Sequence, residues 1–315
     1  MENLNPWTGR IDAEDGERGH RWHQVVQCQH IDELPEHEKA LVLVGYPNDS
    51  GVAANKGRTG AAEGPNALRH ALANLPWCKE GSLYDVGDST IFDVLDDTQC
   101  SYASLVSCAL KKKAKVIGLG GGHDIAWAAF QGLAAALPQG TNIGIINIDA
   151  HLDLRKPSPA GTSGTPFRQI SEWCHQQKMP FHYACFGVSK AANTSALFDY
   201  AKESNTRLLL DYEFNIESAI ATVTPFLESI DSLYVTVCMD AFSSSVAPGV
   251  SAPAALGIPP IAVIQFLQWL GKQQSPLSFR WHYSDIAELN PTYDAEMKTA
   301  RLAARLVFEL TDAMG

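Results

Sequence analysis

The sequence predicts an α/β fold in which helices wrap a parallel β-sheet. Short apolar runs rich in β-branched residues, such as 41–44 and 143–148, indicate buried strands. Stretches of ten or more residues with helical spacing lie between these runs, and this alternation is typical of βαβ units. Acidic residues and histidines follow several of the runs, which predicts a polar rim at one edge of the sheet.

Composition narrows the class of protein. The chain has 315 residues, of which 45% are hydrophobic and 19% charged, as in a globular protein that forms one domain over 1–315. A net charge of −11 disfavours nucleic-acid and anionic-membrane partners. Seven cysteines without a CxxC spacing fit a reducing cytoplasm, and we find no signal peptide and no membrane-spanning apolar stretch.

The first half of the chain predicts strands that alternate with helices. Residues 1–38 are polar with little periodicity and indicate an extended N-terminal arm. A buried strand over 40–47 leads into a glycine-rich loop, and Gly64-Pro65 then begins a helix with its proline in the first turn. The expected elements that follow are an edge strand over 82–87, a helix over 98–110, a strand over 116–119, a helix that ends near 137 and a strand over 143–148.

The second half continues the same alternation. Apolar runs predict strands, and amphipathic runs predict helices between them. The expected strands cover 183–188, 207–210, 233–239 and 282–289. The expected helices cover 194–203, 216–229, 261–272 and 294–311.

The strand over 143–148 ends in a cluster of ligand-type side chains. Side chains alternate along a strand, so Asp149, His151 and Asp153 point the same way. Unpaired carboxylates are unfavourable in a protein interior, and a divalent cation removes that cost. The sequence therefore predicts a metal site at this strand end.

His123 follows three glycines after the strand over 116–119. Glycine allows a sharp turn and a close approach to a ligand, but the spacing fits neither a phosphate loop nor a dinucleotide fingerprint. A histidine in this place is structural more often than functional when it stands alone. Beside the cluster at 149–153, we interpret it as a metal ligand.

Two further strands end in candidate functional residues. Cys238 and Asp240 lie two residues apart and so on one face. We expect Asp240 to be a metal ligand, whereas Cys238 alone indicates a small buried hydrophobic residue. Glu288 has two open interpretations, a surface glutamate that closes its strand and a carboxylate that faces a substrate.

Four segments together resemble the ureohydrolase superfamily of arginase, agmatinase and formimidoylglutamase. They are GGGHD at 120–124, DAHLD at 149–153, Cys-Met-Asp at 238–240 and AELNP at 287–291, in the family's order. Weaker cues make the chain most similar to the formimidoylglutamase branch. These cues lie at 7–12, 21–23, 55–58, 163–167 and 189–194.

The resemblance implies a three-layer α/β/α fold of the arginase type and a small-molecule substrate. It also implies two Mn²⁺ per subunit and a homo-oligomer, for which the sequence indicates no interface. By position, the metal ligands would be His123, Asp149, His151, Asp153, Cys238 and Asp240.

The implied reaction is hydrolysis of N-formimidoyl-L-glutamate to L-glutamate and formamide in histidine degradation. Metal-activated hydroxide would attack the formimino carbon. Glu288 would hold the amidine group, and Asp153 is the candidate that carries a proton to the leaving nitrogen. The glutamate end of the substrate is dianionic, so we expect Arg58 to bind it, with Arg155 as the second candidate.

The chain departs from the family pattern at Cys238, at Ser243-Ser244, where the family usually has Asp-Pro, and in the loop 163–167. Cys238 stands where the family has an aspartate shared by both metals, and Mn²⁺ prefers hard oxygen ligands, whereas a thiolate suits zinc, iron or copper(I). A thiolate ligand, a weakly held second ion and a mixed metal preference stay open. The proton-shuttle histidine of arginase-like enzymes is also missing from 163–167. His182 is a candidate substitute, although a core or surface histidine is the more common role for such a residue.

Two alternatives to this function stay open. One is another ureohydrolase that acts on a guanidino acid, and the other is a catalytically silent relative, which Cys238 suggests. A nucleotide-binding oxidoreductase is disfavoured because no GxGxxG follows the first strand.

Overall fold

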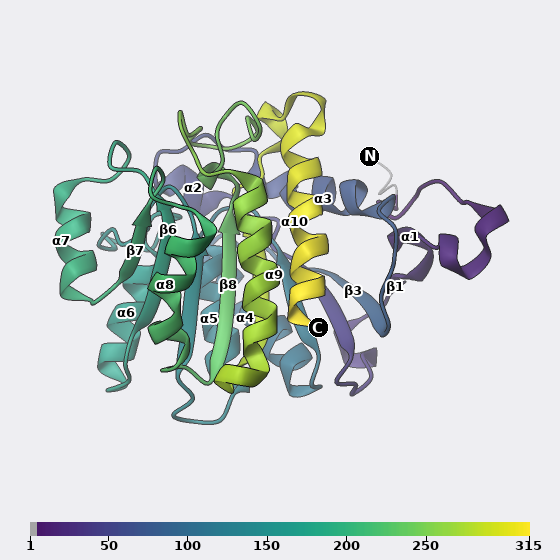
Figure 1. The fold of residues 1–315 in the computed structure, drawn as a ribbon, viewed down its shortest axis with the longest axis horizontal. Coiled ribbons are helices and arrows are strands. Elements are labelled where there is room, and N and C mark those ends of the chain that lie inside the picture. The colour runs from purple at the N-terminus through teal and green to yellow at the C-terminus, as the bar shows by residue number, and fades with distance from the viewer. Residues whose placement is uncertain (1–4) are drawn as a thin grey trace.

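The computed structural model describes residues 5–315, which form one nine-stranded parallel sheet with helices on both faces (Figure 1). The strand order is β1-β3-β2-β4-β9-β8-β5-β6-β7. The strands are β1 Gln27–Cys28, β2 Ala40–Gly45, β3 Ser82–Asp88, β4 Lys115–Leu119, β5 Ile143–Ile148, β6 His182–Val188, β7 Arg207–Leu210, β8 Ser232–Cys238 and β9 Arg280–Ala287.

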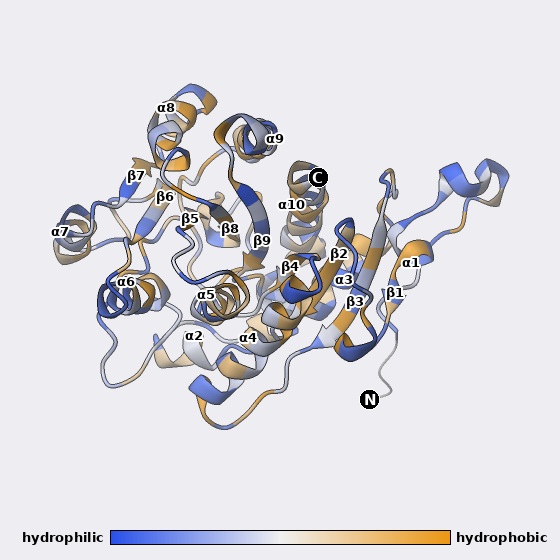
Figure 2. Cartoon of the chain, turned by 90° about the horizontal axis from the view of Figure 1, so that it is seen from below, coloured by the Kyte–Doolittle hydropathy of each residue, from blue (hydrophilic) through white to orange (hydrophobic). Residues whose placement is uncertain are grey.

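Two helical layers cover the sheet. The α-helices are α1 Trp22–Val25, α2 Ser50–Ala54, α3 Gly64–Ala73, α4 Leu95–Lys111, α5 Ile125–Ala136, α6 Pro166–Gln176, α7 Ser195–Glu203, α8 Ile216–Leu227, α9 Pro260–Leu277 and α10 Lys298–Met314. Figure 2 shows α8, α9 and α10 on one side of the sheet and α4, α5 and α6 on the other. Each side has its own apolar core. The predicted three-layer α/β/α architecture is therefore confirmed.

Burial on both faces explains why the central strands are mostly apolar. Every residue of β2, β5 and β8 is buried, as expected for parallel strands covered by helices on both sides. The strand β9 pairs with β4 on one side and with β8 on the other, and β8 pairs in turn with β5. The carboxyl ends of these four strands thus lie side by side, although the strands are far apart in sequence.

Several elements differ from the predicted ones. The helix α6 was not predicted, because polar residues dominate its sequence, although Phe167, Ile170 and Cys174 form a buried stripe behind Pro166 in the first turn. The last helix begins at Lys298 rather than 294, since Glu296 and Met297 have left-handed backbone angles that interrupt it.

The N-terminal region contains more structure than an extended arm. Residues 1–4 of the predicted arm lie outside the described part. The next residues include a 3₁₀ segment Ala13–Gly19, the helix α1 and the edge strand β1, none of which was predicted. Trp22 is fully buried and packs edge-to-face on Trp77, with 5.4 Å between ring centroids, which attaches this region to the body. In Figure 1 the segment around the 3₁₀ helix extends beyond the body.

Among the described helices, we find none with the length and apolarity that a bilayer crossing requires.

Candidate metal centre

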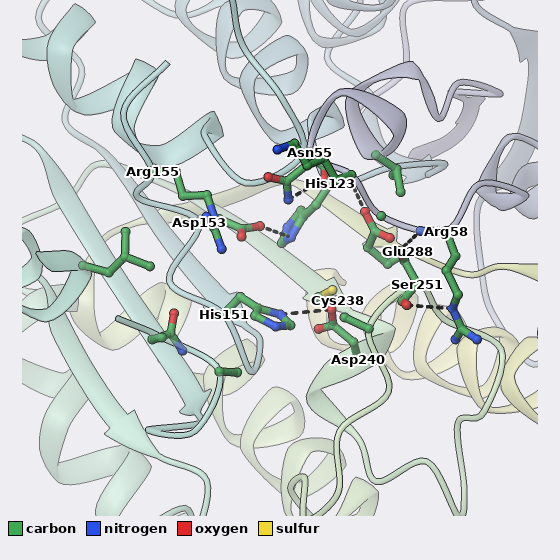
Figure 3. A pocket seen from close by; sticks show the side chains of 18 residues that line it. Asn55, Arg58, His123, His151, Asp153, Arg155, Cys238, Asp240, Ser251 and Glu288 are labelled. Carbon is green, nitrogen blue, oxygen red and sulfur yellow. Dashed lines mark hydrogen bonds and ion pairs between the residues drawn. The ribbon is translucent and has the colours of Figure 1, made fainter. Parts of the chain in front are cut away.

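The predicted ligand residues converge at the carboxyl ends of four neighbouring strands (Figure 3). His123 follows β4, the segment 149–153 follows β5, Cys238 is the last residue of β8, and Glu288 directly follows β9. Asp240 lies in the 3₁₀ turn after β8. They line or adjoin a cavity of about 310 Å³, so the sheet order brings together side chains that are up to 165 residues apart.

Two imidazoles alternate with three carboxylates in this cluster. His123 Nδ1 lies 3.0 Å from Asp149 Oδ2 and 3.0 Å from Asp153 Oδ2. His151 Nδ1 lies 3.1 Å from Asp240 Oδ2 and 3.5 Å from Asp149 Oδ1. Asp149 therefore joins the two halves of the cluster, one oxygen toward each histidine.

The donor atoms form two groups of the size that holds a metal ion. His123, Asp149 and Cys238 make one group, and Asp149, His151 and Asp240 make the other, with donors inside each group within 4.8 Å of one another. Asp153 adjoins the first group through its contact with His123.

Unsatisfied polar atoms give a direct test of whether these residues suit metal ions. His123 Nδ1 and Asp240 Oδ1 are buried and make no hydrogen bond within the described residues, despite the nearby charges. Groups of this kind are costly in a protein interior unless a partner satisfies them. Imidazole, carboxylate and thiol donors in two adjoining groups fit divalent cations.

The electrostatics of the cluster lead to the same conclusion. Burial raises the pKa of Asp153 to about 6, and the Asp149 charge adds to this rise. Burial opposes charge on His151, but Asp240 and Asp149 outweigh it and raise the pKa of this imidazole to about 12. Protons on the histidines thus balance the carboxylates, and a divalent cation would take the place of those protons.

Neighbouring polar groups hold the ligands in position. Thr236 Oγ1, on β8, lies 3.0 Å from Nε2 of His123 and orients its ring. Asn147 donates to Asp149 Oδ2 at 3.1 Å. Asn193 accepts from Leu152 N at 2.9 Å and so braces the loop 149–153. The sequence did not predict these positioning roles. Of the three residues, only Asn193 lies in a segment that the sequence analysis had singled out, the cue at 189–194.

Glu288 occupies a buried place beside the cluster. Its Oε1 accepts a 2.9 Å hydrogen bond from His123 N, whereas Oε2 is buried without a hydrogen-bond partner among the described residues. Burial, with the Asp240 charge, raises the pKa of Glu288 to about 8. The side chain is only 5% exposed, which excludes a surface role and leaves a carboxylate beside the cavity.

The backbone is unusual at two of these positions. Asp153 has φ of 46° and Glu288 has φ of 64°, a left-handed region in which residues other than glycine are uncommon. Such conformations cost about 1 kcal/mol or more each and cluster at functional sites.

The two arginines expected at the glutamate end of the substrate differ in their contacts. Arg58 donates from Nε to Ser251 O at 2.9 Å and from a terminal nitrogen to Val250 O at 2.7 Å, and it stacks on Tyr293 at 3.9 Å. Figure 3 shows it extending away from the histidines. Arg155 also lines the cavity, and within residues 5–315 its guanidinium forms neither a hydrogen bond nor an ion pair.

The candidate substitute for the missing shuttle histidine is wrong. His182 begins β6, so it lies at the amino end of the sheet, opposite the cluster, and its Nδ1 lies 3.4 Å from Ser229 Oγ. The predicted strand over 183–188 begins directly after His182, so the parallel geometry itself indicates the amino end of the sheet for this residue.

A three-layer α/β/α fold with clustered carboxylates, imidazoles and a thiol at its strand ends defines the class of a metal-dependent hydrolase. The sequence model of the Arginase family matches residues 39–312. The chain belongs to the arginase family.

The most similar proteins include several formimidoylglutamases. The enzyme of Aromatoleum aromaticum is 45% identical over 98% of this chain and 92% of its own length. That of Hahella chejuensis is 42% identical over 100% of this chain and 97% of its own. A crystal structure of Trypanosoma cruzi formiminoglutamase with Mn²⁺ superposes with a TM-score of 0.78 at 26% identity and covers 89% of this chain and 95% of that one.

Proposed function

We propose that this chain hydrolyses N-formimidoyl-L-glutamate to L-glutamate and formamide, a step of histidine degradation. The observation that carries this proposal is the 42–45% identity to formimidoylglutamases over almost the whole chain. In the reaction, the bond between the formimino carbon and the glutamate nitrogen breaks. The oxygen of water goes to the carbon to give formamide, and a proton goes to the nitrogen.

The metal ligands in this proposal are the residues of the two donor groups together with Asp153. They are His123, Asp149, His151, Asp153, Cys238 and Asp240. These residues would hold divalent cations, Mn²⁺ as in the T. cruzi enzyme, and the chemistry supplied by such ions is a lowered pKa of bound water, which provides hydroxide near neutral pH.

The protein would orient the substrate and move its proton. Glu288 Oε2 has no partner within the described residues and would accept a hydrogen bond from the cationic amidine, while Oε1 stays bound to His123 N. Asp153, which lies beside His123 at the cavity, would take up the proton that the attacking water loses and pass it to the departing glutamate nitrogen.

The charge distribution of the cavity suits a substrate with a positive end and a negative end. The carboxylates of Asp240 and Glu288 are buried, whereas the basic residues Lys56, Arg58 and Arg155 line the same cavity and are exposed. A cationic amidine would therefore enter first, with the glutamate carboxylates at the basic rim. Arg155 is the better candidate to bind them, because Arg58 already uses two nitrogens on backbone carbonyls.

Product analysis tests this function. Purified protein is stripped of metal, reloaded with Mn²⁺ and given N-formimidoyl-L-glutamate, and formamide and glutamate are measured. Equal release of both, dependent on Mn²⁺, is expected, with little turnover of guanidino acids. Faster turnover of a guanidino acid would favour another ureohydrolase activity, and no turnover of either substrate would favour a silent relative.

A variant pair tests the basic rim. Arg155→Met should raise KM for N-formimidoyl-L-glutamate roughly tenfold or more, because a charge-assisted contact is lost, with a smaller change in kcat. Lys156→Met is the matched control, an exposed neighbour outside the cavity lining. An equal KM in both variants would contradict this role for Arg155.

The proposal includes a cytoplasmic location for the enzyme. All seven cysteines are free thiols, as a reducing cytoplasm would leave them. We also propose a homo-oligomer, which sedimentation of the purified protein would test.

A further inference from the structure

Cys238 occupies only one side of the candidate metal centre. It is the last residue of β8 and is 1% exposed. Its sulfur belongs to the donor group with His123 and Asp149, but not to the group of Asp149, His151 and Asp240. The two groups share Asp149 and differ in their remaining donors, so the two metal positions are not chemically equivalent.

The donors of each group favour different ions. The first group offers one nitrogen, one oxygen and one sulfur, and the second offers one nitrogen and two oxygens. Thiolate ligands select zinc and other soft or borderline ions, whereas carboxylates suit manganese. Asp153 Oδ2 lies 3.0 Å from His123 Nδ1 and can add a second oxygen donor to the first group. The first group still differs from the second, because it contains the sulfur.

Unsatisfied atoms next to the sulfur support a ligand role for it rather than a purely apolar one. His123 Nδ1, which shares the group with Cys238, and Asp240 Oδ1, from the other group, are both buried without a hydrogen bond in the part of the chain that the structure describes. His123 is 1% exposed, and its other ring nitrogen is held by Thr236, so Nδ1 is directed at the cluster.

A second buried cysteine gives the contrast. Cys185, on β6, lies behind the same segment, with its sulfur 3.3 Å from His151 O and 3.8 Å from Asn147 Nδ2. It belongs to neither donor group and does not line the cavity. A thiol can therefore be buried next to these residues without a place among the donors, and only Cys238 has such a place.

We propose that the centre takes two different ions, a thiolate-binding cation such as Zn²⁺ between His123, Asp149 and Cys238, and Mn²⁺ between Asp149, His151 and Asp240. This inference deepens the proposed function, because it concerns the same metal-dependent site. It does not depend on the identity of the substrate.

Cobalt spectroscopy tests the sulfur ligand without an activity assay. Full-length protein is stripped of metal and titrated with Co²⁺, whose bond to a thiolate gives a charge-transfer band in the near ultraviolet. We expect a band that saturates at one equivalent, is lost in Cys238→Asp and Cys238→Ser, and persists in the matched control Cys185→Ser. Absence of the band in the unaltered protein would overturn the proposal whether or not the variants fold.

Metal analysis tests the inequality of the two positions. The stripped protein is dialysed against mixtures of Zn²⁺ and Mn²⁺ and then analysed for both. With Mn²⁺ raised to a large excess over Zn²⁺ in the same dialysis, which offsets the generally tighter binding of Zn²⁺ to any site, we expect one Zn²⁺ and one Mn²⁺ per chain, and a shift toward two Mn²⁺ in Cys238→Asp, which replaces the thiol by a carboxylate. Two ions of one kind in the unaltered protein would contradict the proposal.

The two proposals fail in different ways. Formamide release without a cobalt–thiolate band would refute the mixed centre and leave the hydrolase function in place. A cobalt–thiolate band without turnover of N-formimidoyl-L-glutamate would support the sulfur ligand and refute the proposed hydrolase function.

Discussion

At the scale of single residues, Glu288 shows how position changes the role of an ordinary side chain. Its sequence context permitted a surface glutamate at a strand end, but the structure buries it with one carboxylate oxygen bound to His123 N. The left-handed backbone, with φ of 64°, turns the chain directly after β9 and so places this carboxylate beside the cavity.

Glu288→Gln should lower kcat/KM for N-formimidoyl-L-glutamate roughly 100-fold, because the amide keeps the hydrogen bond from His123 but loses the charge that would hold an amidinium. Steady-state kinetics measure this effect, and metal content should stay unchanged. Glu309→Gln is the matched control, a buried glutamate that binds Arg305 and Gln268 in another part of the protein. Similar losses in both variants would mean that the effect is general destabilisation.

The two arginines illustrate a residue role that the sequence could not settle, namely which of them binds the substrate carboxylates. The cation requirement of a dianionic substrate pointed to Arg58 and Arg155 as candidates. Their ranking depended on the loop that contains Val250 and Ser251, whose carbonyls accept from Arg58. No local pattern in the sequence records that contact, since the partners are 192 and 193 residues away.

At the scale of elements, the glycine loop after β4 connects three strands. Glu288 N donates to Gly121 O at 2.8 Å, and Gly122 N donates to Asn48 O at 2.9 Å. A Cβ at Gly121 would lie 2.1 Å from Asn48 O and 2.8 Å from Tyr46 O, both backbone atoms. Glycine is therefore required for close approach at this point, and that approach positions His123.

Gly121→Ala should destabilise the protein by about 2 kcal/mol, because the backbone has to shift to accommodate the methyl group. It should also weaken metal binding, since His123 is two residues away. Urea unfolding and metal titration measure the two effects. Gly161→Ala is the control, because its Cβ meets only the end of the flexible Gln169 side chain, and a loss of equal size there would contradict the argument.

The strand β9 also carries a histidine that should make stability depend on pH. Burial, followed by the charges of Arg280 and Lys115, lowers the pKa of His282 to about 4. In the unfolded chain this residue takes up a proton near pH 6.5, whereas in the folded chain it does so only near 4. The unfolded state thus binds more protons between these values, and stability falls as the pH falls through this window.

From pH 7.5 to pH 5, this histidine should remove about 2 kcal/mol from the free energy of unfolding. Urea denaturation in the presence of a chelator measures the difference, which should shrink by that amount in His282→Asn. His37→Asn, at an exposed histidine, should leave it unchanged. An unaltered pH dependence in His282→Asn would rule out this origin.

Most helices and strands could be predicted because buried segments have a recognisable apolar pattern in the sequence. The runs at 143–148 and 233–239 are mostly apolar, and the structure has strands at 143–148 and 232–238. The helix α6 and the strand β1 escaped prediction, since one is mostly polar and the other has two residues. Their positions depend on tertiary contacts and not on local periodicity.

At the scale of the whole molecule, the sheet order creates the centre. Strands that end in ligand-type residues could be recognised one by one, and parallel geometry put their ends at one edge. The sequence did not indicate that β4, β9, β8 and β5 are neighbours, because this order depends on crossover connections through the helical layers.

Removal of metal should destabilise the entire fold, because the clustered carboxylates of the centre then lose their cations. At a free Mn²⁺ concentration 100 times Kd, binding contributes about 2.7 kcal/mol, which for a chain of this length corresponds to a fall in Tm of roughly 4 °C on chelation. Differential scanning calorimetry with and without EDTA measures this shift, and added Mn²⁺ should restore Tm. Asp149→Asn, which alters the residue shared by both donor groups, should show a much smaller response. An unchanged Tm in the unaltered protein would contradict metal stabilisation.

The place of β9 in the sheet has a consequence for biosynthesis. This strand, Arg280–Ala287, pairs with β4 and β8 and is the only strand of the described sheet that connects β1-β3-β2-β4 with β8-β5-β6-β7. A ribosome makes it after the other eight. We therefore expect a nascent chain to carry two unjoined half-sheets, each with an open hydrogen-bonding edge, until residues 280–287 are synthesised. Unpaired strand edges are prone to aggregation, so we expect a chaperone to act at these two edges.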